Sequence, residues 1–573
     1  MSELEDYIFT PSPTDESIWT RKCYGLESFA SKMSENLDGF PFLTTTISIK
    51  PAYDQETLAP AVRAAWIALR HSLPAIAVKS SRLPAPDNRF TLTYHVPKDY
   101  GEVEAWASET LFFVAKEVKN VYEVHKQLKD QHWWKPSEGR WVGNLFVSPT
   151  EDGWQFSIVF NHNSNDGRSG FGVLDELLTK LVPILEGSAK PVSELPWGEE
   201  TKRLPPASNV INAQANAHPK KDQAPPALSH LTSWTWPPVR ASPYTPHDIS
   251  ALVVLPFETT SRLHTISKAH GRTISQIVTA LSILAHAEVA LAAAAKAGPE
   301  RFNAVSKSYK ESNVYKIVFT FTNYRHKFPE QYKSLSSETP GPLSTFDGMP
   351  LFLSMDPIGR FFTIDDTTSS VSVNVNSADR DSSDAFWDGL VEATANSWKE
   401  HDLSLQGFAT REETSQGIIH NFDHSILHAP FLITSSIGDL GRLGIFDAYR
   451  PSQAQEHKTV TVTDAICGQR VRVPAIMNLF WEYDGKLSCQ WFTGGEWTTE
   501  EELKQVVDAF RRNNKKVCRQ FEPESWNPDA EIAMVWDAAI DVGAKTRKTW
   551  VEHVKNNISG MVNGSWILAG MLL

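Results

Sequence analysis

The residues whose types and spacing can do chemistry lie in segment 160–170, FNHNSNDGRSG. This segment contains His162, then Asp166 four residues later, then Gly167 directly after the aspartate. Among side chains, the imidazole has the ordinary pKa closest to neutral pH, so it suits general base catalysis. A carboxylate can hold the neighbouring loop, and a glycine permits positive φ or a close approach of another chain segment. The segment therefore predicts a site where His162 takes a proton.

Two regular elements predicted beside this segment would position the histidine. Apolar and polar residues alternate over 154–160, which predicts a half-buried strand. Apolar residues at helical spacing over 174–185 predict a helix after it. By the period of two, His162 continues the apolar face of the strand. Because His and Asp at this spacing are common by chance, the motif alone also fits a loop histidine beside an Asx turn.

The first 190 residues otherwise alternate helix and strand signals. Apolar spacing predicts a helix over 58–69 that ends at Leu73-Pro74. Strands are expected over 75–78 and 90–95. Prolines then recur from 187 to 247 and interrupt any regular element, which predicts a crossover linker, although Trp234 and Trp236 indicate that part of it packs on a surface.

A second α/β region is expected from residue 248 onward. Its predicted helices are two within 259–296, separated at His270-Gly271, then one over 386–398 and one after Thr499. Its predicted strands lie at 251–255, 314–322, 431–435, 459–463, 477–483 and 487–492, the last two joined by a hairpin turn at Asp484-Gly485. The predicted organisation is 1–190, a linker over 191–247, 248–525 and a tail over 526–573.

Composition limits the partners. The chain has 573 residues, too many for one hydrophobic core, and its net charge is -13. That charge would repel phosphate backbones, so we expect no nucleic-acid partner, although a local basic pocket can still hold a small anion. The sequence lacks a P-loop and a dinucleotide-binding fingerprint, so we expect neither NTP nor NAD.

Cysteines and termini indicate the compartment. The four cysteines form no CxxC pair and no zinc-finger spacing, so we expect reduced, buried thiols and no metal site. The acidic start MSELEDYIFT has no apolar core, so no signal peptide is expected. The final WILAGMLL is too short to span a bilayer and is expected to pack on the body, with a weak membrane or partner contact as the alternative. We therefore expect a cytoplasmic protein.

Residues 40–520 resemble the chloramphenicol-acetyltransferase-like superfamily, which includes condensation domains, plant BAHD acyltransferases and fungal alcohol acetyltransferases. The family pattern HxxxDG matches His162 and Asp166-Gly167. In family order, 321–325 (FTNYR) resembles the NxR strand, 434–440 (TSSIGDL) the Ser-x-Ile-Gly segment and 483–487 (YDGKL) the late DG hairpin. Segments 65–70 (AWIALR) and 19–21 (WTR) are most similar to fungal trichothecene 15-O-acetyltransferase-like proteins.

Departures from the pattern narrow the resemblance. Condensation domains usually carry two adjacent histidines, whereas Asn161 precedes His162 here, which favours O-acyl transfer by a stand-alone enzyme. The sequence lacks a DFGWG segment, which argues against a plant BAHD enzyme. The tail over 526–573 has no recognised counterpart.

The resemblance implies a fold and roles for residues. The fold is α/β (α+β), with two similar chloramphenicol-acetyltransferase-like domains facing each other across a central tunnel and His162 at its middle. Asp166 belongs to the catalytic motif but is expected to point away from the tunnel and pair with an arginine. Arg325 is the first candidate partner and Arg21 the second, while a solvated strand-end charge is the alternative for Arg325.

Further residues of the second half are candidates for binding. Ser435 and Ser436 are candidates for the oxyanion site or the acyl channel, or equally for capping strand-end backbone groups. Arg442 and Arg450 are candidates for the CoA phosphates.

The expected function is an acyl-CoA-dependent O-acyltransferase, specifically an O-acetyltransferase, in fungal secondary metabolism. It would use acetyl-CoA as co-substrate, with no permanently bound cofactor, and a small-molecule alcohol such as a terpenoid or trichothecene as acceptor. No membrane partner is expected. The alternatives are a condensation-like enzyme that uses a carrier-bound thioester, and a non-catalytic binding protein that kept the fold.

Overall fold

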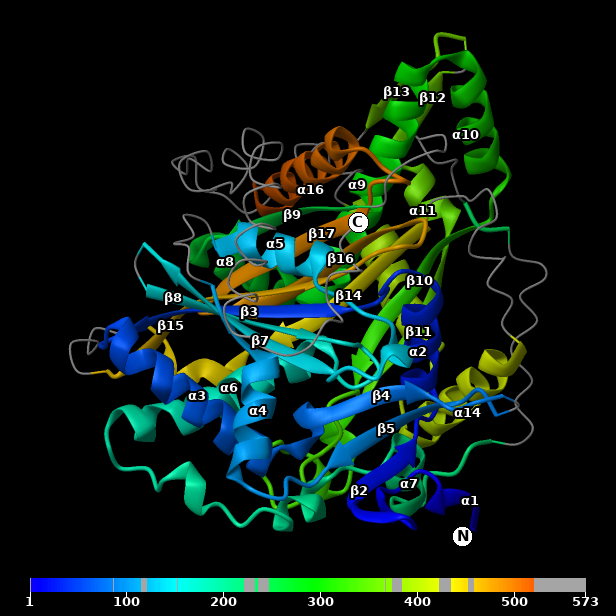
Figure 1. Cartoon of the computed structure of the whole chain (residues 1–573). Coiled ribbons are helices and arrows are strands. Elements are labelled where there is room, and N and C mark those ends of the chain that lie inside the picture. Colours follow the sequence, from blue (N-terminus) through cyan, green and yellow to red (C-terminus); the bar gives the residue numbers. More distant parts are fainter. Residues whose placement is uncertain are drawn as a thin grey trace. The chain divides into compact units, whose positions relative to one another are not determined.

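The computed structural model describes residues 2–85, 87–114, 121–151, 153–220, 232–234, 247–365, 367–373, 384–421, 434–451 and 458–519. Within the compact unit Met1–Ile532, helices and strands mix along the chain, so the predicted α+β class is confirmed (Figure 1). The predicted tail over 526–573 lies outside the described residues.

A five-stranded sheet carries the predicted His162 segment. Its order is β15-β3-β8-β7-β6, with bounds Val460–Gln469, Leu43–Pro51, Gly153–Phe160, Gly143–Thr150 and Leu111–Phe113. Helix α6 (Gly167–Leu185) packs on β3, β8 and β15 and against α3 (Gln55–Ser72), while α5 (Val121–Gln131) packs on the same three strands. On β3, Thr45 approaches Gly170 of α6 and the next residue, Thr46, bonds His125 of α5. Successive side chains point to opposite faces, so α6 and α5 cover the two faces of this sheet.

A six-stranded sheet is built from the second half of the chain. Its order is β11-β10-β14-β16-β17-β9, with bounds Phe346–Ser354, Val314–Asn323, Thr434–Arg442, Ala475–Tyr483, Lys486–Gly494 and Asp248–Leu255. The hairpin between β16 and β17 turns at Asp484 and Gly485, both with positive φ, as predicted. Helix α16 (Glu500–Arg519) packs on β9, β17, α8 (Phe257–Ala269) and α9 (Ile274–Ala297).

The remaining described elements surround these two sheets. A third sheet has the order β1-β2-β5-β4, with bounds Thr10–Ser12, Asp15–Lys22, Phe90–His95 and Val78–Arg82, and β12 (Phe362–Asp365) pairs with β13 (Ser370–Val373). The other helices are α1 (Ser2–Glu5), α2 (Leu26–Asn36), α4 (Tyr100–Thr110), α7 (Ser208–Gln214), α10 (Pro299–Glu311), α11 (Met355–Gly359), α13 (Glu392–Lys399) and α14 (Leu405–Asn421). Short 3-10 helices lie at Pro74–Ala77, Pro136–Glu138, Val192–Glu194, Glu199–Arg203, Arg325–Lys327, Glu330–Tyr332 and Gly444–Tyr449, and a π-helix at Ala385–Val391.

Three local predictions need correction. The strand expected over 75–78 is a 3-10 helix over Pro74–Ala77, because proline at its first position favours a helical turn, and β4 begins only at Val78. The strand expected over 431–435 is described from Thr434 and extends to Arg442, while 431–433 lie outside the described residues. The proline-rich stretch 191–247 does hold a helix, α7, because residues 207–218 contain no proline.

One strand ties the two halves of the sequence together. Strand β15 belongs to the second half by position, yet it pairs antiparallel with β3 at the edge of the five-stranded sheet. It also contacts β16 and β17 of the six-stranded sheet. Strand β15 therefore links the five-stranded sheet to the six-stranded sheet, and the expected domain bounds stay a prediction.

Helix α9 is long and apolar enough to cross a membrane by length and composition alone. Within the protein, 78% of its apolar window is buried. It packs against α10, α16 and β14. Its apolar character is therefore that of a core helix.

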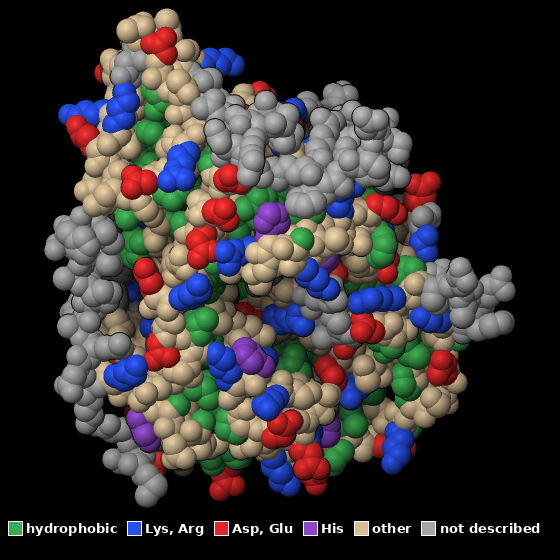
Figure 2. Space-filling view, turned by 180° about the vertical axis from the view of Figure 1, so that it is seen from behind, with side chains coloured by type: hydrophobic (Ala, Val, Ile, Leu, Met, Phe, Trp, Pro, Cys, Tyr) green, Lys and Arg blue, Asp and Glu red, His purple; other side chains and the backbone are tan. Residues whose placement is uncertain are grey.

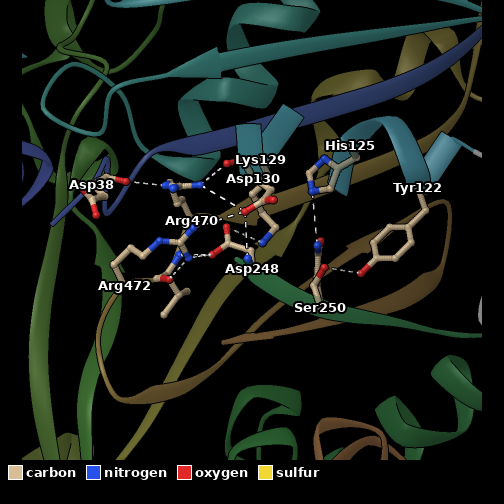
Figure 3. A network of polar contacts seen from close by, with 11 residues as sticks. Asp38, Tyr122, His125, Lys129, Asp130, Asp248, Ser250, Arg470 and Arg472 are labelled. Carbon is tan, nitrogen blue, oxygen red and sulfur yellow. Dashed lines mark hydrogen bonds and ion pairs between the residues drawn. The ribbon is translucent and has the colours of Figure 1, made fainter. Parts of the chain in front are cut away.

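A buried ion cluster joins the halves beside β15 (Figure 3). Lys129 of α5 lies 3.1 Å from Asp248 of β9, and both side chains are fully buried. Arg472 pairs with the same carboxylate at 2.5 Å, and Arg470 lies 3.5 Å from Asp130. Although burial opposes ionisation, these cations hold the pKa of Asp248 below its ordinary value.

We predict that Asp248→Asn destabilises the protein, because it leaves Lys129 and Arg472 buried without their carboxylate. The expected loss is about 3–5 kcal/mol of unfolding free energy, measured by denaturant unfolding. Asp6→Asn is the control, since the Lys22–Asp6 pair has a similar length, 2.7 Å, but is half exposed and should lose at most about 1 kcal/mol. Equal losses in both variants would contradict a stabilising role of the cluster.

Candidate active site

The loop that follows β8 presents His162 at the end of the five-stranded sheet. Strand β8 ends at Phe160, and the amide of Asn161 donates to the carbonyl of Val142 at 3.0 Å. The chain then turns, with the Ser164 amide donating to the Asn161 carbonyl at 3.1 Å. His162 is only 5% exposed, so the motif lies inside the protein and not on a solvated loop.

The imidazole of His162 is fixed through its Nδ1 atom. Nδ1 lies 2.7 Å from the carbonyl oxygen of Asn165, which can only accept, so Nδ1 carries the hydrogen. In the neutral ring, the lone pair is then on Nε2. Burial lowers the pKa of His162 to about 4, although the Asp166 carboxylate and the Asn165 carbonyl favour the protonated form. The ring is therefore neutral at physiological pH.

Asp166 caps the helix that follows the loop. Its side chain accepts a hydrogen bond from the Ser169 amide at 2.9 Å, which explains why α6 begins at Gly167. The same carboxylate accepts from Nη2 of Arg325 at 2.9 Å and from the Thr345 amide at 2.9 Å. Burial opposes its ionisation, but the Arg325 guanidinium and these amides hold the pKa of Asp166 below 3.8.

Arg325 binds the loop to the second half of the chain. It lies two residues after Asn323, the last residue of β10, and is 8% exposed. Besides Asp166, it donates to the carbonyl oxygens of Pro342 and Leu343 at 3.0 Å and 2.7 Å. The structure thus places the first candidate partner on Asp166, not in solvent, while Arg21 pairs with Glu27 at 2.7 Å.

The start of α6 also meets β14, the strand of the predicted Ser-x-Ile-Gly segment. Arg168 donates from Nη1 to the Leu440 carbonyl at 2.8 Å. A Cβ on Gly167 would lie 3.1 Å from Leu440 and 3.2 Å from Cys467, so close approach explains the glycine here. The start of α6, directly after the His162 loop, therefore meets this second-half strand although about 270 residues separate Arg168 from Leu440.

The other predicted residues lie on or after β14. Ser435 pairs in register with Ile317 and Ile476, and Ser436 with Met477, so both lie within the sheet. Arg442 is the last residue of β14. Arg450 lies at the surface and pairs with Asp447 at 2.6 Å. The structure brings the loop to Leu440 of this strand, and the binding roles of these four residues stay predictions.

Several participants were not identified from sequence. The motif is also held by the Asn165 carbonyl, Ser169, Leu343 and Thr345. Of these, only Ser169 had a signal in the sequence, because a small polar residue three positions after Asp166 fits a helix cap. Asn163 holds the loop from inside, donating to Ser31 at 2.9 Å and Ser80 at 2.8 Å.

A small cavity lies beside the loop. A cavity of about 10 Å³, lined by Arg21, Glu27, Ser164, Leu343 and Ser344 among others, has room for one water molecule. No group of three or more His, Cys, Asp or Glu that could hold a metal occurs in the part of the chain that the structure describes.

Figure 2 shows the face opposite to that of Figure 1, where basic and acidic side chains intermingle around a depression near the middle.

No protein-family model matches this chain. The acyl-CoA-dependent acyltransferase MAC1 of Pseudozyma antarctica (strain T-34) is 31% identical over 113 residues, which is 18% of this chain and only a fifth (20%) of that relative's length. Among solved structures, TRI3 trichothecene 15-O-acetyltransferase from Fusarium sporotrichioides matches with a TM-score of 0.66 and 13% identity, over 90% of this chain and 99% of that one. Polyketide synthase associated protein 5 from Mycobacterium tuberculosis matches with a TM-score of 0.53 and 12% identity, over 87% of this chain and 99% of that one.

These likenesses show the fold. The chain has the chloramphenicol-acetyltransferase-like fold that its motifs predicted. The predicted HxxxDG motif lies where the two halves of that fold meet, at contacts with Arg325, Leu343 and Leu440.

We predict that His162 titrates with a midpoint near pH 4 and not near its ordinary 6.5, because burial disfavours its charged form. The measurement is the NMR signal of the imidazole Cε1–H as a function of pH, assigned by its loss in His162→Gln. The unfolded chain binds this proton below about pH 6.5 and the folded chain does not, so this group lowers stability as the pH falls from 6.5 towards 4. A midpoint at or above 6.5 would contradict a desolvated neutral base.

Proposed function

We propose that this chain is an acyl-CoA-dependent O-acyltransferase, specifically an O-acetyltransferase, that acts on a hydroxyl of a secondary metabolite. The observation that carries the proposal is the 2.7 Å bond between Nδ1 of His162 and the Asn165 carbonyl, in a loop fixed by the Asp166–Arg325 pair. The fold shared with a trichothecene acetyltransferase and the local match to an acyl-CoA-dependent acyltransferase support the same reaction class.

The proposed reaction follows from the tautomer of His162. With hydrogen on Nδ1, Nε2 accepts the proton of the alcohol as its oxygen attacks the thioester carbonyl. The tetrahedral intermediate then collapses, the C–S bond breaks, and the proton passes from Nε2 to the departing thiolate. General base catalysis of this kind contributes about 10²- to 10⁴-fold, and the low pKa of His162 keeps the base form populated.

Asp166 supports the base indirectly in this mechanism. Its two carboxylate oxygens accept hydrogen bonds from Arg325, Ser169 and Thr345. None of these bonds involves the Nε2 atom of the imidazole. Its charge favours the protonated ring that forms during the reaction. The expected function of the pair is to hold the loop so that the Asn165 carbonyl keeps its place.

We propose a substrate tunnel along the junction between the two halves, with acyl-CoA and the alcohol entering from opposite ends. At the start of α6, Ser169 bonds Leu343 and Arg168 bonds Leu440, which supports this position because residues from both halves converge there. Ser435 or Ser436 would donate to the oxyanion, and Arg442 or Arg450 would bind CoA phosphates. A fungal, cytoplasmic enzyme acting on a terpenoid or trichothecene alcohol is the proposed setting.

We predict that His162→Ala lowers acyl transfer by about 10²-fold or more while the protein stays folded. The measurement is thiol release from acetyl-CoA with a panel of terpenoid alcohols, together with the mass of the acetylated product. His270→Ala is the control, since this partly exposed histidine stacks on Trp387 in the second half and lies outside the site.

Each outcome distinguishes the alternatives. Near wild-type kcat in His162→Ala would overturn the general base assignment. An inactive wild-type protein that still binds acyl-CoA would favour the non-catalytic binding protein. Activity only with a carrier-bound thioester would favour the condensation-like enzyme.

A further inference from the structure

Asn165 has a buried side chain that no described residue binds. The residue is 1% exposed, and neither its Oδ1 nor its Nδ2 has a hydrogen-bond partner among the described residues. Burying an amide without partners costs stability, and native proteins leave few such groups. Asn212 of α7 is buried without side-chain partners in the same way, so the lack of partners carries weight at Asn165 only together with its position.

The position of Asn165 places this unsatisfied amide beside the proposed base. Its own carbonyl accepts the Nδ1 hydrogen of His162, and the next residue is the fixed Asp166. The backbone of Asn165 therefore contacts the imidazole, and two rotatable bonds join the carboxamide to that backbone.

The other asparagines of the loop each make at least one side-chain hydrogen bond, although Nδ2 of Asn161 and Oδ1 of Asn163 also lack a partner among the described residues. Asn163 is equally buried, but its Nδ2 donates to Ser31 and Ser80. The Oδ1 of Asn161 accepts from the Asn163 amide at 3.1 Å. These two side chains hold the loop, whereas that of Asn165 contributes no hydrogen bond to the described structure.

We propose that the Asn165 carboxamide positions the acceptor by hydrogen bonding a second oxygen next to the hydroxyl that His162 deprotonates. The amide offers one acceptor and two donor hydrogens, which complement a hydroxyl that both donates and accepts. The acceptor class is then a vicinal diol or similarly polyoxygenated alcohol, not an isolated alcohol. This inference rests on the proposed acyl transfer and adds the feature that selects the acceptor.

A substitution at Asn165 separates this role from fixing the base. Asn165→Ala removes the carboxamide but keeps the backbone carbonyl that holds His162. We expect kcat/KM for cis-cyclohexane-1,2-diol with acetyl-CoA to fall about 10- to 100-fold, mainly through KM, because the lost bond is to an oxygen that does not react. For cyclohexanol, which lacks the second oxygen, kcat/KM should fall less than for the diol, so the ratio of diol to cyclohexanol kcat/KM should fall.

The melting temperature distinguishes acceptor binding by Asn165 from a purely structural role, because the two roles predict opposite changes in the Asn165→Ala variant. Asn165→Ala should keep or raise the melting temperature, because it removes an unpaired buried amide. The matched control, Asn163→Ala, should lower the melting temperature and leave the ratio of diol to cyclohexanol kcat/KM unchanged.

The outcomes distinguish this inference from the proposed function. If the wild-type protein transfers no acyl group to any alcohol, the proposed acyl transfer is overturned. The Asn165 site would still be supported if the diol raises the melting temperature of the wild type and Asn165→Ala abolishes this rise. The Asn165 site would be overturned if an active Asn165→Ala variant kept the diol preference of the wild type, or if both proteins bound the diol equally. A large loss of stability in Asn165→Ala would also overturn it. That last result would mean that water or protein groups satisfy the amide.

Discussion

The buried pair between Asp166 and Arg325 is the interaction on which the candidate site depends. It joins the residue before α6 to the second residue after β10, across the two halves of the sequence. Because Asp166 also caps α6 and accepts from Thr345, one carboxylate sets where the helix starts and where the loop lies. The Asn165 carbonyl, one residue earlier, then has a fixed place from which to hold the imidazole of His162. A loose loop would leave His162 free to rotate and to take either tautomer.

Two other constraints keep the halves together. Strand β15 completes the sheet of the first half while contacting the sheet of the second. Beside it, Lys129, Asp248 and Arg472 form an ion cluster that also spans the halves. Burial at the junction lowers the pKa of His162 and makes the Asp166–Arg325 pair costly to break. The same burial therefore makes the ion pair between the halves costly to break and keeps the proposed base, His162, neutral.

The sequence predicted what repeats or is local, and missed what only packing decides. The alternation over 154–160 and the cap at Asp166 are local, so the strand, the loop and the helix of the motif were all predictable. Arg325 was identified through the family pattern, because nothing local to either residue announces a pair 159 positions apart. The role of the Asn165 carbonyl could not be read, since every residue carries a carbonyl and only the fold selects one. Two elements show the same limit. Apolar composition predicted a strand where Pro74 begins a 3-10 helix, and the frequent prolines of the linker predicted no helix where α7 forms.

A double-mutant cycle on Asp166→Asn and Arg325→Gln tests the central claim most directly, with unfolding free energy and kcat/KM measured for all four proteins. If the pair holds the loop, each single variant leaves a buried group without its partner and costs about 3–5 kcal/mol, and the double variant costs less than the sum of the two. Acyl transfer should fall in all three variants, because all three release the Asn165 carbonyl. Stability losses that simply add, or an Asp166→Asn variant that is fully stable yet inactive, would contradict the account and place Asp166 directly in the chemistry.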